Sequence, residues 1–238
     1  MADHFVYNPP ADHGLTIIHQ DIDILVVSKP AGLLSVVGRN PTADNRLGDA
    51  LHARVLREFP DALIVHRLDM DTSGLMVMGL SKDAHRHLSI QFEKRKIEKA
   101  YIAQVWGVVS SDSGRIDLPV RCDWDRRPRQ IVDFEHGKSA QTDWTVLERG
   151  ENTTRVVLKP VTGRTHQLRV HMATLGKSDP LDFNAFDVEG GHPILGDDFY
   201  AHQDAYEAVG RLCLHAQDLG FYHPRSNEFV RFHSECDF

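Results

Sequence analysis

Short apolar runs of strand length and amphipathic helical patterns follow one another along this chain without strict alternation. The run Ile24-Leu25-Val26-Val27 ends at Lys29-Pro30-Ala31-Gly32, which is typical of a buried strand closed by a turn. Further strand-like runs lie at 62–65, 75–80, 101–105, 155–158 and 212–219. Because strands and helices are mixed rather than repeated as regular βαβ units, we predict an α+β fold.

Three segments carry a helical pattern. Residues 42–59 have apolar side chains every four positions and end before Pro60. Ser81 is a good N-cap for a second helix. A third pattern opens at Gly163 and ends at Gly176, a residue that favours helix C-termini. We expect one face of this third helix to carry Leu168, Met172 and Leu175.

Charge and hydropathy exclude several classes of protein. The 238 residues contain 27 Lys and Arg against 34 Asp and Glu, a formal net charge of −7. A globally basic nucleic-acid coat is therefore excluded, and any such site must be a local basic patch. No apolar run reaches the roughly 18 residues that a membrane span requires. The N-terminus also lacks the basic and apolar regions of a signal peptide.

Local composition indicates how the chain is organised into an arm and a domain. Residues 1–14 are polar and contain Pro9-Pro10, so we expect an irregular arm, followed by a single domain at 15–238. The three cysteines are odd in number and widely separated, which favours free thiols in a reducing cytoplasm over a disulfide framework.

The segment 66–74 concentrates chemistry between two strand-like runs. It contains one His, one Arg, two Asp and two hydroxyl side chains in nine residues. Strands deliver such a loop to a fixed place, where active sites are common. A polar turn with side chains bonded to the backbone explains the same composition. The residues alone do not choose between Asp69 and Asp71 as a reactive carboxylate.

Six segments in order resemble the motifs of the RluA family of RNA pseudouridine synthases. The first is Val26–Leu33, and the second is His66-Arg67-Leu68-Asp69 followed by Thr72-Ser73-Gly74. The remaining four are Lys99–Ala103, Gly163–His171, His192–Asp197 and Leu214–Ala216. Cys122-Asp123-Trp124 and the arginines after it are similar to members with dual specificity for 23S ribosomal RNA and tRNA.

The resemblance implies a fold and a reaction. The fold is a central mixed, mostly antiparallel sheet flanked by helices, with a cleft across the sheet and no additional S4 domain. The reaction turns a uridine into pseudouridine, without a metal or an organic cofactor. Asp69 is implied as the catalytic carboxylate, which attacks C1′ to form an ester or removes the 2′ proton to give a glycal.

Two further catalytic residues are implied by the family pattern. Arg169 would keep Asp69 ionised, since a guanidinium can hold a carboxylate with two parallel bonds. Tyr101 would stack on the uracil or move the C5 proton. A solvated helix arginine and an ordinary core tyrosine are the alternatives for these two positions.

A larger group of residues is predicted to contact RNA. Arg67 is implied to enter the RNA stack when the target base is extruded, although a plain salt bridge is an alternative. A local basic patch is predicted at Arg126, Arg127 and Arg129, with a solvated surface as the alternative. The other predicted substrate-binding residues are His66, Arg164, Leu195 and Leu214. Stem-loops of 23S rRNA and tRNA are the implied partners, and we expect a monomer.

One departure from the family pattern is an acidic insertion at about 178–191, which contains four acids and no Lys or Arg.

Other functions are less well supported. Fifteen histidines suggest a zinc hydrolase, but their spacings do not match a ligand set. A non-catalytic RNA-binding or chaperone protein and an RNA N-glycosylase are the remaining alternatives.

Overall fold

The computed structural model describes residues 7–38, 48–177 and 191–238. The chain divides into two compact units. The first contains Met1–Glu98 and Ala216–Glu235, and the second contains Lys99–His215 and Cys236–Phe238. The acidic insertion predicted at 178–191 lies, except for Gly191, outside the described residues.

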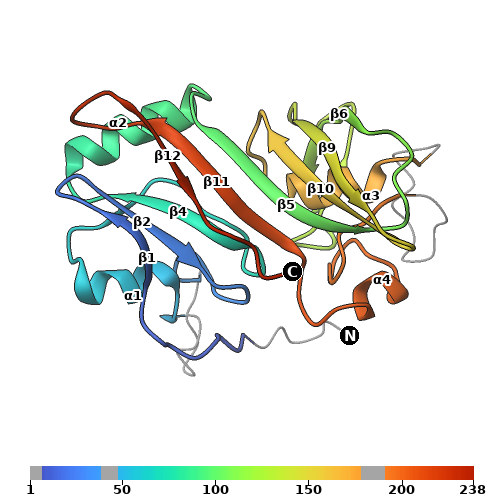
Figure 1. Cartoon of the computed structure of the whole chain (residues 1–238), viewed down its shortest axis with the longest axis horizontal. Coiled ribbons are helices and arrows are strands. Elements are labelled where there is room, and N and C mark those ends of the chain that lie inside the picture. The colour runs from blue at the N-terminus through green and yellow to red at the C-terminus, as the bar shows by residue number, and fades with distance from the viewer. Residues whose placement is uncertain (1–6, 39–47, 178–190) are drawn as a thin grey trace. The chain divides into compact units, whose positions relative to one another are not determined.

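The first unit is built on a largely antiparallel sheet (Figure 1). Its strands follow the order β1-β2-β4-β11, with β3 paired to β4 and β12 paired to β11. The strands are β1 (Thr16–Gln20), β2 (Ile24–Lys29), β3 (Leu63–Ile64), β4 (Ser73–Gly79), β11 (Leu214–Tyr222) and β12 (Phe229–His233). All seven residues of β4 are buried, because this strand lies between neighbours and is covered on both faces.

A hydrophobic core holds the sheet of this unit against helix α2 (Lys82–Glu93). The core residues are Ile24, Val26, Leu75, Val77, Leu88, Leu219 and Phe221. The predicted N-cap is confirmed, since Ser81 Oγ accepts a hydrogen bond from the backbone N–H of Ala84 at 3.1 Å.

Helix α1 (Leu51–Glu58) is shorter than the helix predicted at 42–59. Ala50 is extended, and the backbone N–H groups of Leu51 and His52 donate to the carbonyls of Leu34 and Ser35. These tertiary bonds satisfy the first N–H groups of the helix and set its start. Residues 42–47 of the predicted helix lie outside the described residues.

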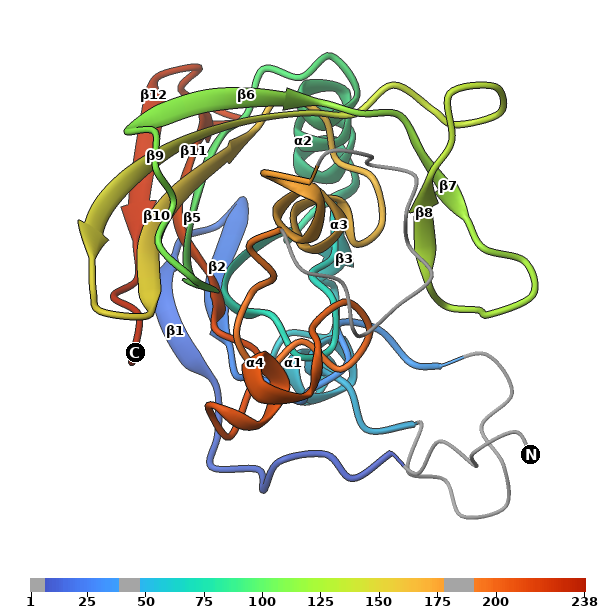
Figure 2. The same cartoon turned by 90° about the vertical axis from the view of Figure 1, so that its right-hand side faces the viewer.

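In the second unit, four antiparallel strands pair in the order β5-β10-β9-β6, and β7 and β8 form a separate hairpin (Figure 2). Its strands are β5 (Glu98–Trp106), β6 (Ser113–Asp117), β7 (Val120–Cys122), β8 (Gln130–Val132), β9 (Gln141–Arg149) and β10 (Thr153–Pro160). Its helices are α3 (Gln167–Thr174) and the short α4 (Gln203–Glu207).

Helix α3 begins later than predicted and is more deeply buried than its apolar pattern alone indicates. It begins at Gln167 rather than near Gly163, because His166 has a left-handed backbone with φ of 51°. Leu168 and Met172 belong to one hydrophobic core and Leu175 packs against it, as predicted for one face of the helix, but all eight helix residues are buried, which was not predicted. The helix is enclosed because its polar side chains, including Gln167, Arg169 and His171, find hydrogen-bond partners inside the unit.

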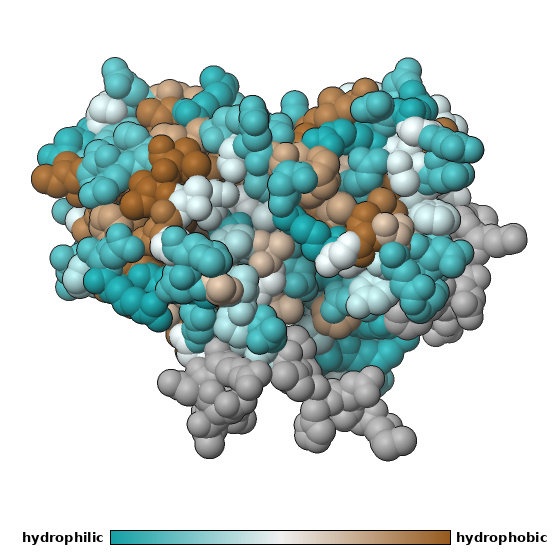
Figure 3. Space-filling view, turned by 60° about the horizontal axis from the view of Figure 1, so that its bottom comes forward, coloured by the Kyte–Doolittle hydropathy of each residue, from teal (hydrophilic) through white to brown (hydrophobic). Residues whose placement is uncertain are grey.

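The antiparallel sheets and few helices confirm the predicted α+β class. Six strands were not predicted, and each has mostly exposed or half-buried residues: β1, β6, β7, β8, β9 and β12. The visible face in Figure 3 is mostly hydrophilic, with hydrophobic residues in separate groups. Within the described residues, no helix has the length and apolar character to cross a membrane.

Candidate active site

The polar loop between β3 and β4 carries Asp69 in the first unit. Ser35 Oγ donates to the carbonyl of Leu68 at 2.7 Å and accepts from the backbone N–H of Leu68 at 3.1 Å. The backbone N–H of Thr72 donates to the carbonyl of Asp69 at 3.2 Å. These bonds hold the backbone beside Asp69, whose side chain is half-buried.

Lys29 holds the same loop from its other side. Its side chain is only 1% exposed, and Nζ donates to the carbonyls of Leu33 and Met70 at 2.7 Å and of Pro30 at 2.9 Å. Three carbonyl acceptors match the three N–H donors of an ammonium, which offsets the cost of burying it. The segment from Lys29 to Ser35 therefore restrains both neighbours of Asp69, as pre-organised catalysis requires.

Three other residues of this motif have different surroundings. His66 Nε2 accepts from the backbone N–H of Val77 at 3.1 Å, and its ring stacks on Phe92 with centroids 4.5 Å apart. Arg67 is exposed. Gly74 has φ of 110°, and a Cβ there would lie 2.3 Å from the carbonyl oxygen of Ala216. Only glycine allows β4 to approach β11 so closely.

Arg169 on α3 is paired within the second unit to two carboxylates that the sequence had not predicted as its partners. Its Nε donates to Asp197 Oδ2 at 2.7 Å and its Nη2 to Asp197 Oδ1 at 2.5 Å. Nη2 also donates to Asp198 Oδ1 at 2.7 Å. Arg169 is 2% exposed and Asp197 0%, whereas the Asp198 side chain is 42% exposed. The motif 192–197 contained Asp197, but no role followed from its spacing.

The turn 197–200 surrounds the Arg169 guanidinium. Asp197 Oδ1 also accepts from the backbone N–H groups of Phe199 and Tyr200. The rings of Phe199 and Tyr200 lie 5.1 and 5.3 Å from the guanidinium carbon of Arg169. This arrangement combines a two-bond ion pair with cation–π contacts, and it fixes the orientation of the guanidinium.

Tyr101, Leu195 and Leu214 all belong to the core of the second unit or pack against it. Tyr101 lies on β5 opposite Leu158 of β10, and its side chain is half-buried. Leu195 is 3% exposed and Leu214 2%. Arg164 Nε donates to the carbonyl of Ser139 at 3.1 Å, so this predicted RNA contact also braces the approach to α3.

His171 on α3 is fully buried and neutral. Its Nδ1 lies 2.9 Å from Thr142 Oγ1, and its Nε2 lies 3.0 Å from the carbonyl of Leu118. Burial lowers the pKa of His171 to about 4, against a smaller opposing effect of the hydrogen bond to Leu118. The contacts assign His171 a structural role.

This burial predicts a pH-dependent loss of stability. The unfolded chain protonates His171 near its ordinary pKa of 6.5, whereas the folded chain does so only near 4. Stability falls as pH decreases from 6.5 to 4, and we expect His171 to contribute about 3 kcal/mol of this loss. Urea unfolding at pH 7 and at pH 4 should show the wild type losing that much more than His171→Gln. An equal loss in both proteins would contradict the prediction, and the exposed His136→Gln serves as control.

The three arginines of the predicted basic patch lie after β7 and have distinct partners. Arg126 Nε donates to Asp123 Oδ2 at 2.7 Å. The guanidinium carbon of Arg127 lies 4.2 Å from the ring centre of Trp124. That of Arg129 lies 5.9 Å from the ring centre of Phe199. Arg126 pairs with an aspartate of its own segment, whereas Arg127 and Arg129 each lie against an aromatic ring, so the three positions are not equivalent.

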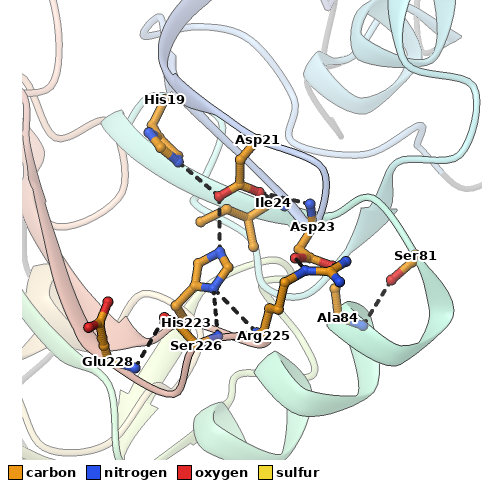
Figure 4. Close-up of polar contacts among 10 residues, drawn as sticks. All are labelled: His19, Asp21, Asp23, Ile24, Ser81, Ala84, His223, Arg225, Ser226 and Glu228. Carbon is orange, nitrogen blue, oxygen red and sulfur yellow. Dashed lines mark hydrogen bonds and ion pairs between the residues drawn. The ribbon is translucent and has the colours of Figure 1, made fainter.

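A carboxylate–histidine group lies elsewhere in the first unit (Figure 4). Asp21 Oδ2 lies 3.1 Å from His19 Nε2 and 2.9 Å from His223 Nε2. Partial burial raises the pKa of Asp21, but hydrogen bonds from two backbone N–H groups and both histidines outweigh it and hold the pKa at about 2. Asp23 is bound by Arg225 through two bonds. With a guanidinium on Asp23, these contacts favour a structural clamp over a cation site.

Comparison with known proteins identifies the family. The model of the RNA pseudouridylate synthase family matches residues 23–174. The dual-specificity RNA pseudouridine synthases RluA of Salmonella typhi and Escherichia coli K12 are each 47% identical over 233 residues, which is 98% of this chain and 98% of the relative. This chain belongs to the RluA family of RNA pseudouridine synthases. It is therefore an isomerase whose substrate is RNA.

Other members of the family extend the comparison. RluA of Yersinia pestis is 48% identical over 225 residues, covering 94% of this chain and all of the relative. The solved structure of human RNA pseudouridylate synthase domain containing 1 has a TM-score of 0.74 and 29% identity, covering 97% of this chain and 87% of the human chain. The family match includes Asp69, Tyr101 and Arg169 but ends before the Asp197 and Asp198 partners of Arg169.

Proposed function

We propose that this enzyme isomerises a uridine in a stem-loop of 23S rRNA, of the tRNA anticodon arm, or of both, with Asp69 as the catalytic carboxylate. The observation that carries the proposal is the restraint of Asp69. Lys29 binds the carbonyl of Met70 and Ser35 binds the backbone of Leu68, so the residues on both sides of Asp69 are held in place. The name of the RluA relatives states dual specificity, which supports two classes of RNA substrate.

The reaction breaks the N1–C1′ bond of the uridine and forms a C5–C1′ bond, and the proton leaves C5 as N1 regains one. Product and substrate have the same mass. An ionised Asp69 serves either as a nucleophile at C1′ or as a base at C2′. Both routes require a carboxylate held close to the ribose, and a fixed backbone reduces the entropy that this positioning costs.

Arg169 and Tyr101 complete the proposed catalytic set. By the family pattern, Arg169 keeps Asp69 ionised and Tyr101 contacts the uracil or moves its C5 proton. The hold of Asp197 and Asp198 on Arg169 supports a positioned guanidinium, since a flexible arginine would lose its orientation. The negative charges of Asp197 and Asp198 also compensate much of the positive charge of Arg169. The sequence alone did not predict this unfavourable effect.

RNA binding is proposed for residues of both units. Arg67 is exposed, long and cationic, as a residue that fills the space of an extruded base must be. Arg126, Arg127 and Arg129 would contact phosphates and give a marked salt dependence. We also propose His66, Arg164, Leu195 and Leu214 as substrate contacts, and a cytoplasmic location, with which the free Cys122, Cys213 and Cys236 agree.

An RNA stem-loop carrying tritium at C5 of uracil tests the proposal. We expect wild-type protein to release one tritium into water for each uridine converted, while the strand stays intact and its mass is otherwise unchanged. Release of free uracil would instead indicate an N-glycosylase. RNA binding without tritium release from either the rRNA hairpin or the anticodon stem-loop would contradict the proposed substrates and favour a non-catalytic binding protein.

A further inference from the structure

An exposed tryptophan with a stacked arginine stands out in the segment between β7 and β8. The Trp124 side chain is 63% exposed, although tryptophan is usually largely buried. The guanidinium carbon of Arg127 lies 4.2 Å from its ring centre, within the range of a cation–π contact. Figure 2 shows this loop at the end of the β7–β8 hairpin, beyond the strands of the second unit.

Hydrogen bonds within this loop order its backbone. Asp123 is 7% exposed and accepts hydrogen bonds from the backbone N–H of Asp125 and from Arg126 Nε. The backbone N–H of Asp123 donates to the carbonyl of Arg129 at 2.9 Å, and that of Arg129 donates to the carbonyl of Arg126 at 3.0 Å. These bonds close the loop on itself, so Trp124 is presented to solvent by a restrained backbone.

Charge distinguishes this tryptophan from other exposed apolar residues. Phe134 is 61% exposed at the other end of the same hairpin, but Asp133 and Glu135 flank it. Asp123 and Asp125 flank Trp124 as well, but Arg126 pairs with Asp123, and Arg127 and Arg129 follow in the same loop of a chain with net charge −7. Aromatic rings among cations are the arrangement by which proteins stack unpaired bases while their cations contact phosphates.

We propose that Trp124 and Arg127 form a stacking platform for one unpaired base of the RNA substrate. This inference rests on the proposed function, which supplies a stem-loop with unpaired bases. Arg127 lies over the indole, and the large exposed area of the ring leaves room for a base. Arg127 then has two roles, because its charge also attracts phosphate, whereas Trp124 contributes stacking without charge.

The first test measures the affinity of an anticodon stem-loop RNA for variants at several salt concentrations. We expect Trp124→Ala to weaken binding by about 5- to 150-fold, the range of base–aromatic stacking, with an unchanged salt slope. Trp124→Phe should restore most of the affinity. Arg127→Ala should weaken binding and also reduce the salt slope by about one. An affinity of Trp124→Ala equal to that of wild type would overturn the platform.

The second test locates the base. Abasic sites are introduced one at a time in the RNA loop, and each RNA is bound to wild type and to Trp124→Ala. At one loop position, loss of the base should weaken wild-type binding but have little further effect in Trp124→Ala, because both changes remove the same contact. Equal effects of every abasic site in the two proteins would show that Trp124 stacks on no base.

The matched control is Phe134→Ala, which removes an exposed aromatic side chain from the same hairpin and should leave RNA affinity unchanged. A loss of affinity in Phe134→Ala equal to that in Trp124→Ala would indicate a general effect on the hairpin and overturn the specific role. Tritium release separates this inference from the proposed function. If wild type releases tritium and Trp124→Ala binds normally, only the platform is wrong. If wild type releases none, the function is wrong, and the abasic cycle still decides the platform.

Discussion

Asp69→Asn should bind RNA with nearly wild-type affinity and form pseudouridine on the order of 10⁴-fold more slowly, or not at all. The amide keeps the shape of the side chain and removes its negative charge, so it can neither attack C1′ nor take a proton. The loop should keep its conformation, because Lys29 and Ser35 bind the backbone of Met70 and Leu68, which the substitution leaves unchanged. Single-turnover tritium release at saturating enzyme measures the chemical step directly.

Asp71→Asn is the matched control, since it makes the same change two residues away in the same loop. We expect it to remain within a few-fold of wild type, because the family pattern places the reaction on Asp69. The opposite pattern, with an active Asp69→Asn and an inactive Asp71→Asn, would transfer the catalytic role to Asp71. The unfolding free energies of both variants should be measured alongside, to separate lost chemistry from lost structure.

Asp197→Asn should cost about 3–5 kcal/mol of unfolding free energy, because it leaves the buried Arg169 guanidinium without its principal counter-charge. Asp197 is 0% exposed and accepts two bonds from Arg169 and two from backbone N–H groups. An amide in its place would direct an N–H toward a donor. Urea unfolding at neutral pH, followed by tryptophan fluorescence, measures the loss.

Asp198→Asn is the matched comparison for Asp197→Asn, because both aspartates bind Arg169. Its carboxylate also bonds Nη2 of Arg169, but it is 42% exposed, and we expect a change within about 1 kcal/mol. The double variant Arg169→Met, Asp197→Leu should recover much of the stability that Asp197→Asn loses, since it removes both buried charges, but it should not recover activity. Equal losses of unfolding free energy in Asp197→Asn and Asp198→Asn would show that burial does not determine how strongly each ion pair stabilises the protein.

Local patterns in the sequence correctly predicted the elements around the site. The apolar run before Lys29 became β2, the fully buried β4 followed the polar loop, and Ser81 capped α2. These features depend on side chains within a few residues of one another, so periodicity and capping chemistry report them. The order of the six motifs pointed to the family for the same reason, since each motif is a short local segment.

Several contacts between distant segments were not predicted. The partner of Arg169 lies 28 residues further along the chain, and the carbonyl that Lys29 holds at Met70 lies 41 residues away. Helix α1 begins at Leu51 because its first N–H groups donate to residues 34 and 35, although the apolar spacing extends back to Leu47. The complete burial of helix α3 was not predicted either, because its polar residues have buried partners in distant segments of the unit.

The chain therefore encodes buried strands such as β2 and β4, the cap of α2 and the reactive loop through neighbouring side chains, and those could be identified before any coordinates were known. Folding decides which distant oxygen atoms come together. It alone determines that Lys29 and Ser35 restrain the backbone around Asp69, and that two aspartates bind Arg169. A buried charge is tolerated only beside such partners, and spacing along the sequence does not encode their positions.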